Sequence, residues 1–268
     1  MHTFLKAFIK TEYGLAILSC SFILVFTLIN QSWSDFVSVV DQTLQSIPAR
    51  AQLASLEGAD SGLIGWWKFD EGSGTMVMDS SGSGNNGTLV NGPVWTAGKY
   101  GQALSFDGND DKVVVSASPI LDLTSDLTVS AWVKGASANN IGTIVARSDG
   151  GVLLNSPEKG YALMYRIING NVYWYYNVSG SSGQVIVYWN SGSPPDNNWH
   201  HVLAVTSGNT HKIFIDGIER NSITAITGDK SISVPLIIGD DNNGSDRFTG
   251  AIDDIRIYNR ALSVSEIQ

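Results

Sequence analysis

From residue 63 to the C-terminus, short runs of β-forming residues alternate with turns rich in Gly, Asn, Asp and Ser. Runs of this length between such turns predict strands rather than helices. Asn169-Gly170, which lies between two aromatic-rich runs, is typical of a two-residue hairpin turn. The alternation of strand and helix that a parallel sheet requires does not occur. The sequence therefore predicts an all-β fold, a two-sheet antiparallel jelly roll or a related sandwich.

The individual strands follow from the positions of these runs. Further turns are expected at Asp107-Gly108, Gly208-Asn209 and Asp216-Gly217. The one helix expected after residue 62 is terminal, because Ser263 to Glu266 has the form of a capping box. The predicted strands cover residues 64–69, 103–106, 112–115, 127–133, 142–147, 161–167, 171–176, 184–188, 200–206, 211–215, 236–238 and 250–258.

The N-terminal segment carries a different signal. An apolar run at residues 15–29 lies within a longer uncharged stretch that is long enough for a membrane-spanning helix. Lys6 and Lys10 precede this run, which favours a cytoplasmic N-terminus and an extracytoplasmic body. Residues 1–30 are therefore interpreted as a membrane anchor, with a cleaved signal segment or a buried apolar helix as alternatives. The prediction is a single-pass cell-surface protein, secreted if the segment is cleaved.

Residues 31–61 are interpreted as a stalk or linker, with a short amphipathic helix expected at residues 35–47. Residues 62–268 are assigned to the sandwich. The formal net charge of −9 argues against nucleic-acid binding and fits a protein that collects hard cations through carboxylates. Cys20 is the only cysteine, which excludes an intrachain disulfide and a cysteine-based metal site.

Seven segments of the body occur in an order typical of one domain family. They are GLIGWWKFDEGSGT (62–75), DSSGSGNNGTL (79–89), GQALSFDGNDDKVVV (101–115), LTVSAWVK (127–134), NWHHVLAV (198–205), KIFIDG (212–217) and FTGAIDDIRIYNRALSVSEI (248–267). Together they resemble the laminin-G-like, concanavalin A-like jelly-roll domains of bacterial extracellular proteins. The resemblance implies a two-sheet sandwich with a binding or adhesion role, often toward glycans and often with a structural calcium ion.

A calcium site is expected near the last strand. Strand alternation places Asp253 on the same face as Ile255 and Ile257, which should face the core. A carboxylate that shares the core face must be paired, hydrogen-bonded or bound to metal. The resemblance implies that the loop starting at Asp79 meets this strand. Asp79 and Asp253 are therefore the first candidate Ca²⁺ ligands.

Asp70, Asn86 and Asp107 are the further oxygen donors predicted for this ion. Each carboxylate also has a simpler interpretation. A β-bulge could turn Asp253 outward, or its carboxylate could cap loop amides. Asp107-Gly108 could be an ordinary turn, and Asp70 could serve a turn or a cap. Residues 240–246 are interpreted as an acidic hairpin turn, because their Gly does not fall where an EF-hand loop needs it.

The strands predicted at residues 161–167, 171–176 and 184–188 contain no Asp or Glu. A glycosidase needs two carboxylates that face each other across a cleft, so catalysis is not expected on these strands. His200 and His201 are adjacent on one strand and must point to opposite faces. They are interpreted as structural rather than as metal ligands.

The same middle strands are rich in aromatic residues. Tyr173 and Tyr175 share one face, and Trp174 lies on the other. One side should therefore be more exposed, where flat rings can stack on sugars. Tyr188 and Trp189 are expected to extend the surface formed by Tyr173 and Tyr175. The alternative is that these rings only pack a sheet that is covered by loops.

The leading hypothesis is a non-catalytic extracellular recognition or adhesion module that binds carbohydrate or a cell-surface protein, with calcium holding its loops and the N-terminal segment in the membrane. The second is a structural subunit of a surface assembly or pilus-like appendage. The third is a glycan-active enzyme of the same fold, which would need paired carboxylates in a concave cleft.

Overall fold

The computed structural model describes residues 61–135, 141–148, 159–193, 196–241 and 243–268. The predicted anchor at residues 15–29 and the predicted helix at residues 35–47 lie outside these ranges. Among the described residues, no helix has the length and apolar character needed to cross a membrane.

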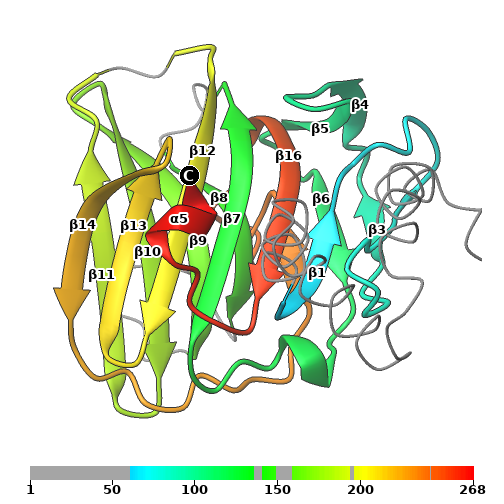
Figure 1. The fold of residues 1–268 in the computed structure, drawn as a ribbon. Helices are drawn as coiled ribbons and strands as arrows, with labels where there is room; N and C mark the ends of the chain where they lie inside the picture. Colours follow the sequence, from blue (N-terminus) through cyan, green and yellow to red (C-terminus); the bar gives the residue numbers. More distant parts are fainter. Residues whose placement is uncertain (1–60, 136–140, 149–158, 194–195, 242) are drawn as a thin grey trace, which may run out of the picture. The chain divides into compact units, whose positions relative to one another are not determined.

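The described strands form two antiparallel sheets of eight strands each, as the sequence predicts (Figure 1). The first sheet has the order β14-β13-β12-β7-β16-β5-β4, with β1 also paired to β16. Its strands are β1 (Leu63–Trp67), β4 (Val94–Ala97), β5 (Gln102–Asp107), β7 (Leu127–Lys134), β12 (Trp199–Ser207), β13 (Thr210–Ile215), β14 (Ile218–Thr224) and β16 (Thr249–Tyr258).

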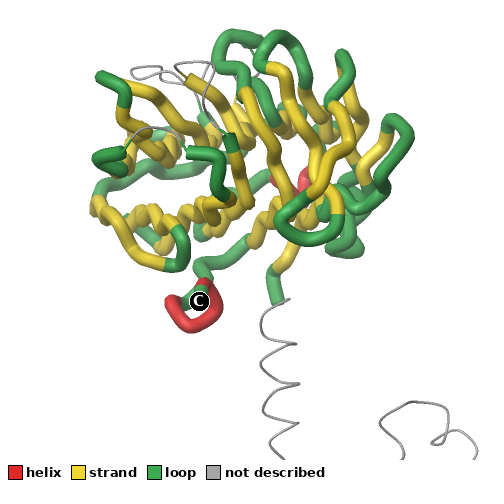
Figure 2. Tube along the Cα trace, turned by 90° about the horizontal axis from the view of Figure 1, so that it is seen from above, coloured by secondary structure: helices red, strands yellow, loops and turns green. Residues whose placement is uncertain are grey.

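The second sheet has the order β11-β10-β9-β8-β15-β6-β3-β2. Its strands are β2 (Met76–Val77), β3 (Gly87–Val90), β6 (Lys112–Val115), β8 (Ile141–Ser148), β9 (Gly160–Ile168), β10 (Asn171–Gly180), β11 (Gly183–Asn190) and β15 (Leu236–Ile238). Within the described residues, strands make up most of the body seen from above, and the helices drawn are short (Figure 2).

The core lies between the sheets because each strand turns alternate side chains inward. Val129 and Ile213 of the first sheet pack with Leu163 and Tyr176 of the second in one buried cluster. Burying apolar side chains at about 25 cal/mol per Å² is the main term that holds such a sandwich together. Smaller clusters lie on the outer faces, where Ile267 covers part of the first sheet.

The hairpin predicted at Asn169-Gly170 is confirmed. Both residues have positive φ, 52° and 79°, as a type I′ turn requires. The strands on either side pair in continuous register from Asn171↔Ile168 to Ser179↔Gly160. Asp216 and Gly217, with φ of 54° and 74°, make the same kind of turn between β13 and β14.

Every predicted strand is present. The structure differs from the prediction in where some strands end and in four additional strands that are short or polar. β1 stops at Trp67 rather than Phe69, because Phe69 adopts a left-handed conformation with φ of 55°. β2, β3, β4 and β14 are not among the predicted strands. The first three have two to four residues, and β14 is largely polar, so neither alternation nor hydrophobicity marks them.

The terminal helix α5 (Val264–Ile267) confirms the predicted capping box of Ser263 and Glu266. A further short 3₁₀ helix, η1 (Pro119–Leu121), was not predicted. Buried Arg147 holds it by donating to the carbonyl oxygen of Leu121 at 2.7 Å. The Arg147 guanidinium also lies 3.2 Å from the carboxylate of Asp122.

A polar chain crosses the core and joins the two sheets. The hydroxyl of Tyr176 in β10 lies 2.6 Å from Thr206 Oγ1 in β12, which lies 2.9 Å from Nδ1 of buried His211 in β13. His211 Nε2 bonds the carbonyl oxygen of Ala225 at 3.0 Å. The central hydroxyl therefore satisfies polar groups on both sides, which would be costly to bury alone.

We predict that Thr206→Val destabilises the protein more than Tyr176→Phe. The first change leaves two buried polar groups without their partner, at about 2–4 kcal/mol, while the second keeps the Thr206–His211 bond and costs about 1 kcal/mol. Urea unfolding of both variants measures the difference. A smaller loss for Thr206→Val would contradict this assignment.

Candidate ligand-binding site

Three tyrosines of the second sheet form a stacked group on its outer face. The rings of Tyr175 and Tyr188 stack at 5.6 Å between centroids, and those of Tyr173 and Tyr175 at 6.5 Å. Tyr173 and Tyr188 lie 6.3 Å apart. The group arises because Tyr175 and Tyr188 are direct partners across β10 and β11, and Tyr173 lies two residues along the same face.

The three rings differ in exposure. Tyr188 is 49% exposed and Tyr173 is half-buried, whereas Tyr175 is only 7% exposed. Burial also raises the pKa of Tyr175 above its ordinary value. Tyr175 therefore supports the other two rings, which offer the accessible aromatic surface. We call Tyr173, Tyr175 and Tyr188 the tyrosine face.

Polar groups border this face. The side-chain amide of Asn190 donates to the hydroxyl of Tyr173 at 3.0 Å. Arg166 of β9 is the direct strand partner of Tyr173 and shares its side of the sheet. Rings flanked by hydrogen-bonding groups match the two needs of sugar binding, a flat apolar surface and polar contacts for hydroxyls.

Trp189 does not extend the tyrosine face, in contrast to the prediction. It pairs directly with Trp174 and packs against the main core between the sheets. The reason is strand alternation, since Trp189 follows Tyr188 and must point to the opposite side.

The prediction that Asp253 shares the core face with Ile255 and Ile257 is also wrong. A bulge in β16 shifts the register with β7 between Asp253↔Trp132 and Arg256↔Ser130. Asp254 takes a positive φ of 46° within this bulge. The extra residue reverses the alternation, so Ile252 and Ile255 both face the core while Asp253 lies on the outer side.

Asp253 is nevertheless fully buried, because the hairpin between β4 and β5 covers it. Its Oδ2 accepts hydrogen bonds from the backbone amides of Lys99 at 2.7 Å and Tyr100 at 3.0 Å. Its Oδ1 is buried without a hydrogen-bond partner among the described residues. Burial, only partly offset by the Tyr100 and Lys99 amides, raises the pKa of Asp253 to about 6.

Asp70 contacts the same hairpin, and its Oδ1 accepts from the amide of Gln102 at 3.0 Å. Side chains at two positions of this hairpin would collide with the carboxylates. A Cβ on Gly98 would lie 2.6 Å from Asp253 Oδ2, and one on Gly101 would lie 2.0 Å from Asp70 Oδ1. The structure thus brings Asp70 and Asp253 to one turn.

Asp79 and Asn86 lie together at a second place. Asp79 Oδ1 accepts from the amides of Trp66 and Ser81, each at 2.9 Å, and Oδ2 accepts from Asn85 at 2.8 Å. The amide of Asp79 donates to Asn86 Oδ1 at 2.9 Å. Backbone amides thus surround the Asp79 carboxylate and give its loop a defined shape.

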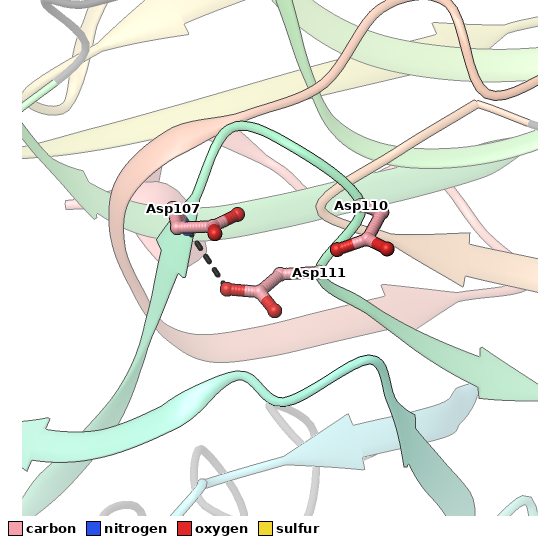
Figure 3. A group of neighbouring side chains, drawn as sticks. All are labelled: Asp107, Asp110 and Asp111. Carbon is pink, nitrogen blue, oxygen red and sulfur yellow. Dashed lines mark hydrogen bonds between the residues drawn. The ribbon is translucent and has the colours of Figure 1, made fainter.

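Asp107 lies at a third place, with Asp110 and Asp111 on the β5–β6 connection (Figure 3). One carboxylate oxygen from each of the three lies within 4.8 Å of the others. Asp107 itself caps the turn, with Oδ1 accepting from the amide of Asn109 at 2.8 Å. Asp110 and Asp111 are candidate oxygen ligands outside the predicted set, although they lie only three and four residues after Asp107.

The acidic segment after β15 is more buried than a surface hairpin. Asp240, Asp241 and Asp246 are each no more than 3% exposed. Asp241 accepts from the amide and hydroxyl of Ser245, and Asp240 lies 3.6 Å from Lys112 Nζ. Burial and the neighbouring Asp241 raise the pKa of Asp246 to about 6.

The two adjacent histidines point to opposite faces, as alternation predicts. His201 stacks on Trp132 at 5.1 Å on the outer side. His200 lies inward near Trp174, with Nδ1 2.9 Å from Asp216 and Nε2 3.1 Å from Asp196. One carboxylate at each ring nitrogen leaves His200 no free nitrogen for a metal.

Strand order and packing define a two-sheet sandwich of the concanavalin A-like kind. A sequence model described as the concanavalin A-like lectin/glucanases superfamily, Laminin_G_3, matches residues 107–268, and the chain belongs to this family. The match begins at the β5–β6 turn and includes the tyrosine face.

Three comparisons illustrate the range of similar proteins. The chain is 24% identical over 178 residues to the adhesion G-protein coupled receptor V1 of Danio rerio, covering 62% of this chain. The binding domain of Paraclostridial Mosquitocidal Protein 1 aligns with a TM-score of 0.61 and 17% identity, over 78% of this chain and 51% of that one. Domain 4 of AbnA, an extracellular arabinanase from Geobacillus stearothermophilus, aligns with a TM-score of 0.57 and 22% identity, over 76% and 96% of the two chains.

The chain spans about 3% of the length of the curated relatives it matches. The two solved structures are only 17% and 22% identical to the chain, so the likeness shows a shared fold and does not by itself show a shared function.

We predict different effects for two substitutions of Asp253. Asp253→Ala removes the acceptor of two buried amides and should cost about 2–4 kcal/mol of unfolding free energy. Asp253→Asn keeps an acceptor oxygen and should cost less. Denaturant unfolding in the presence of a chelator compares the two variants, and equal losses would contradict the role given to this carboxylate.

The raised pKa of Asp253 also makes the free energy of unfolding depend on pH. The folded state holds the proton of Asp253 more tightly than the unfolded chain does, so protonation of this carboxyl stabilises the fold. The stabilisation is complete below about pH 4 and is lost as the pH rises through about 6. The stability of Asp253→Asn relative to wild type should therefore increase between these pH values. A difference that stays constant with pH would contradict the assignment.

Proposed function

We propose that the sandwich is a non-catalytic, extracellular binding module that recognises glycans through its tyrosine face. The observation that carries this proposal is the stacking of Tyr173, Tyr175 and Tyr188 on the outer side of one sheet, with Tyr188 half-exposed. Aromatic rings held in fixed positions lose little entropy on binding and suit the flat faces of sugars.

Related proteins support a binding role. One is an adhesion receptor by name, and the mosquitocidal neighbour is a binding domain. The AbnA domain was solved in complex with arabinotriose. That domain belongs to an enzyme, but the carboxylates described here serve mainly as backbone caps and salt-bridge partners, and β9, β10 and β11 have none. These features favour recognition over hydrolysis.

We predict that Tyr188→Ala weakens glycan binding by about tenfold or more, since it removes the most exposed ring of the face. The 268-residue chain is screened against neutral oligosaccharides, arabinotriose included, and the best one is titrated by calorimetry. Tyr188→Phe should retain stacking.

Tyr100→Ala is the matched control, because Tyr100 is 56% exposed but lies in the β4–β5 turn, beside Trp132 of the other sheet. Unchanged affinity in Tyr188→Ala, or failure of every oligosaccharide to bind, would contradict the proposed glycan surface.

We further propose that Ca²⁺ stabilises the loops near β16. The support is the buried Oδ1 of Asp253, which lacks a hydrogen-bond partner among the described residues and is thus available to a hard cation. Asp70 at the same hairpin is the candidate second ligand, whereas Asp79 and Asn86 lie apart with their oxygens bonded to amides. Asp107 with Asp110 and Asp111 forms the competing group of oxygens.

We predict that Ca²⁺ raises the melting temperature of the chain relative to a chelator, because an ion that binds only the folded state stabilises it. Asp253→Asn should abolish the increase if the ion lies at β16, and Asp110→Asn should abolish it if the ion lies at the β5–β6 turn. Differential scanning fluorimetry measures both. No change of melting temperature with Ca²⁺ would refute the metal proposal.

A further inference from the structure

A cleft of about 260 Å³ lies on the inner side of β10 and β11, separate from the tyrosine face. Its walls come from both sheets, with Trp174 and Trp189 on one side and His200, Asp216 and Arg220 on the other. The two indoles are direct strand partners, and Trp189 is only partly buried. The cleft is therefore lined by aromatic surface and closed by charged groups.

A β-bulge places Arg220 in this cleft. Ile213 pairs with Asn221 and Phe214 with Glu219, so Arg220 is the extra residue on β14. Its guanidinium carbon lies 4.5 Å from the ring centroid of Trp189. Bulges often redirect a side chain next to a binding site. Here the bulge turns a cation, rather than an apolar side chain, toward the space between the sheets.

Arg220 has no ion pair or hydrogen bond within the described part of the chain, and its buried Nε lacks an acceptor. Lys134, which also lines the cleft, has no carboxylate partner among the described residues either. A guanidinium presents several N–H donors in a fixed planar fork that fits a carboxylate. The cleft thus holds two cations that no carboxylate of the described residues pairs with.

The acidic residues of the cleft are already engaged. Asp216 bonds His200 through Oδ2 and the amide of His201 through Oδ1, both at 2.9 Å. Asp196 bonds His200 and caps the amide of Asn198. Burial opposes the charge on His200, but the bonds to Asp216 and Asp196 outweigh it and raise the pKa of His200. Both carboxylates thus direct their hydrogen bonds to His200 and to neighbouring amides, and neither pairs with Arg220.

We propose that this cleft binds a hexuronic acid, with the sugar carboxylate on the Arg220 guanidinium and the ring against the wall formed by Trp174 and Trp189. Its volume is smaller than the roughly 300–1,000 Å³ of sites for drug-sized ligands, which favours a single sugar ring. Asn198, which also lines the cleft, supplies a side-chain amide for ring hydroxyls. The cleft shares no residue with the tyrosine face, so the hexuronate proposal and the glycan proposal can be tested separately.

The test uses the 268-residue chain with D-glucuronate and D-galacturonate, against glucose and galactose as neutral counterparts. Calorimetry should show binding of at least one hexuronate at least about tenfold tighter than its neutral counterpart, since a charge-assisted pair with Arg220 forms only with the acid. Arg220→Gln should abolish the difference. Arg220→Lys should bind more weakly than wild type because the planar fork is lost.

Lys212→Gln is the matched control, because Lys212 on the neighbouring strand is already paired with Glu219 at 2.8 Å. It should leave hexuronate affinity unchanged, as should Tyr188→Ala, which alters only the tyrosine face. Failure of both hexuronates to bind would overturn the proposal, as would equal binding of acid and neutral sugars. Full affinity in a folded Arg220→Gln variant, or equally tight binding of inorganic sulfate, would overturn it too.

Discussion

Each strand of this sandwich must present one row of side chains to the gap between the sheets and the other row to the outside. That constraint divides the aromatic residues of β10 and β11. Tyr173, Tyr175 and Tyr188 fall on the outer side, whereas Trp174 and Trp189 fall on the inner side. One pair of strands therefore builds two chemically different surfaces, a stack of tyrosines and a wall of indoles, without any change of backbone.

Two β-bulges interrupt the alternation of side chains, and each places a charged residue on a different side of its sheet. The bulge in β16 moves Asp253 out of the core and under the β4–β5 hairpin, whose amides it holds. The bulge in β14 moves Arg220 over Trp189. In both cases one extra residue changes the side of the sheet on which a charged side chain lies. Asp253 becomes fully buried there, and Arg220 partly buried.

Alternation and turn chemistry suffice to predict most of the fold. The Asn169-Gly170 hairpin, the capping box at Ser263 and the opposite directions of His200 and His201 all follow from local rules. The tyrosine face is partly predictable for the same reason, except that Trp189 was assigned to the wrong side. Bulges are not marked by residue type, so neither the outward position of Asp253 nor the inward position of Arg220 could be derived. The acidic residues at the β5–β6 turn were visible, but their proximity depends on backbone geometry.

The central claim is that the two sides of β10 and β11 bind different ligands. Its most direct test is a nuclear magnetic resonance titration of one labelled sample, first with the best neutral oligosaccharide and then with a hexuronate. The account predicts that the oligosaccharide shifts the signals of Tyr173 and Tyr188, and that the hexuronate then shifts the indole N–H signals of Trp174 and Trp189 and the guanidinium signal of Arg220. If both ligands shift one common set of signals, or if these residues do not respond, the account is contradicted.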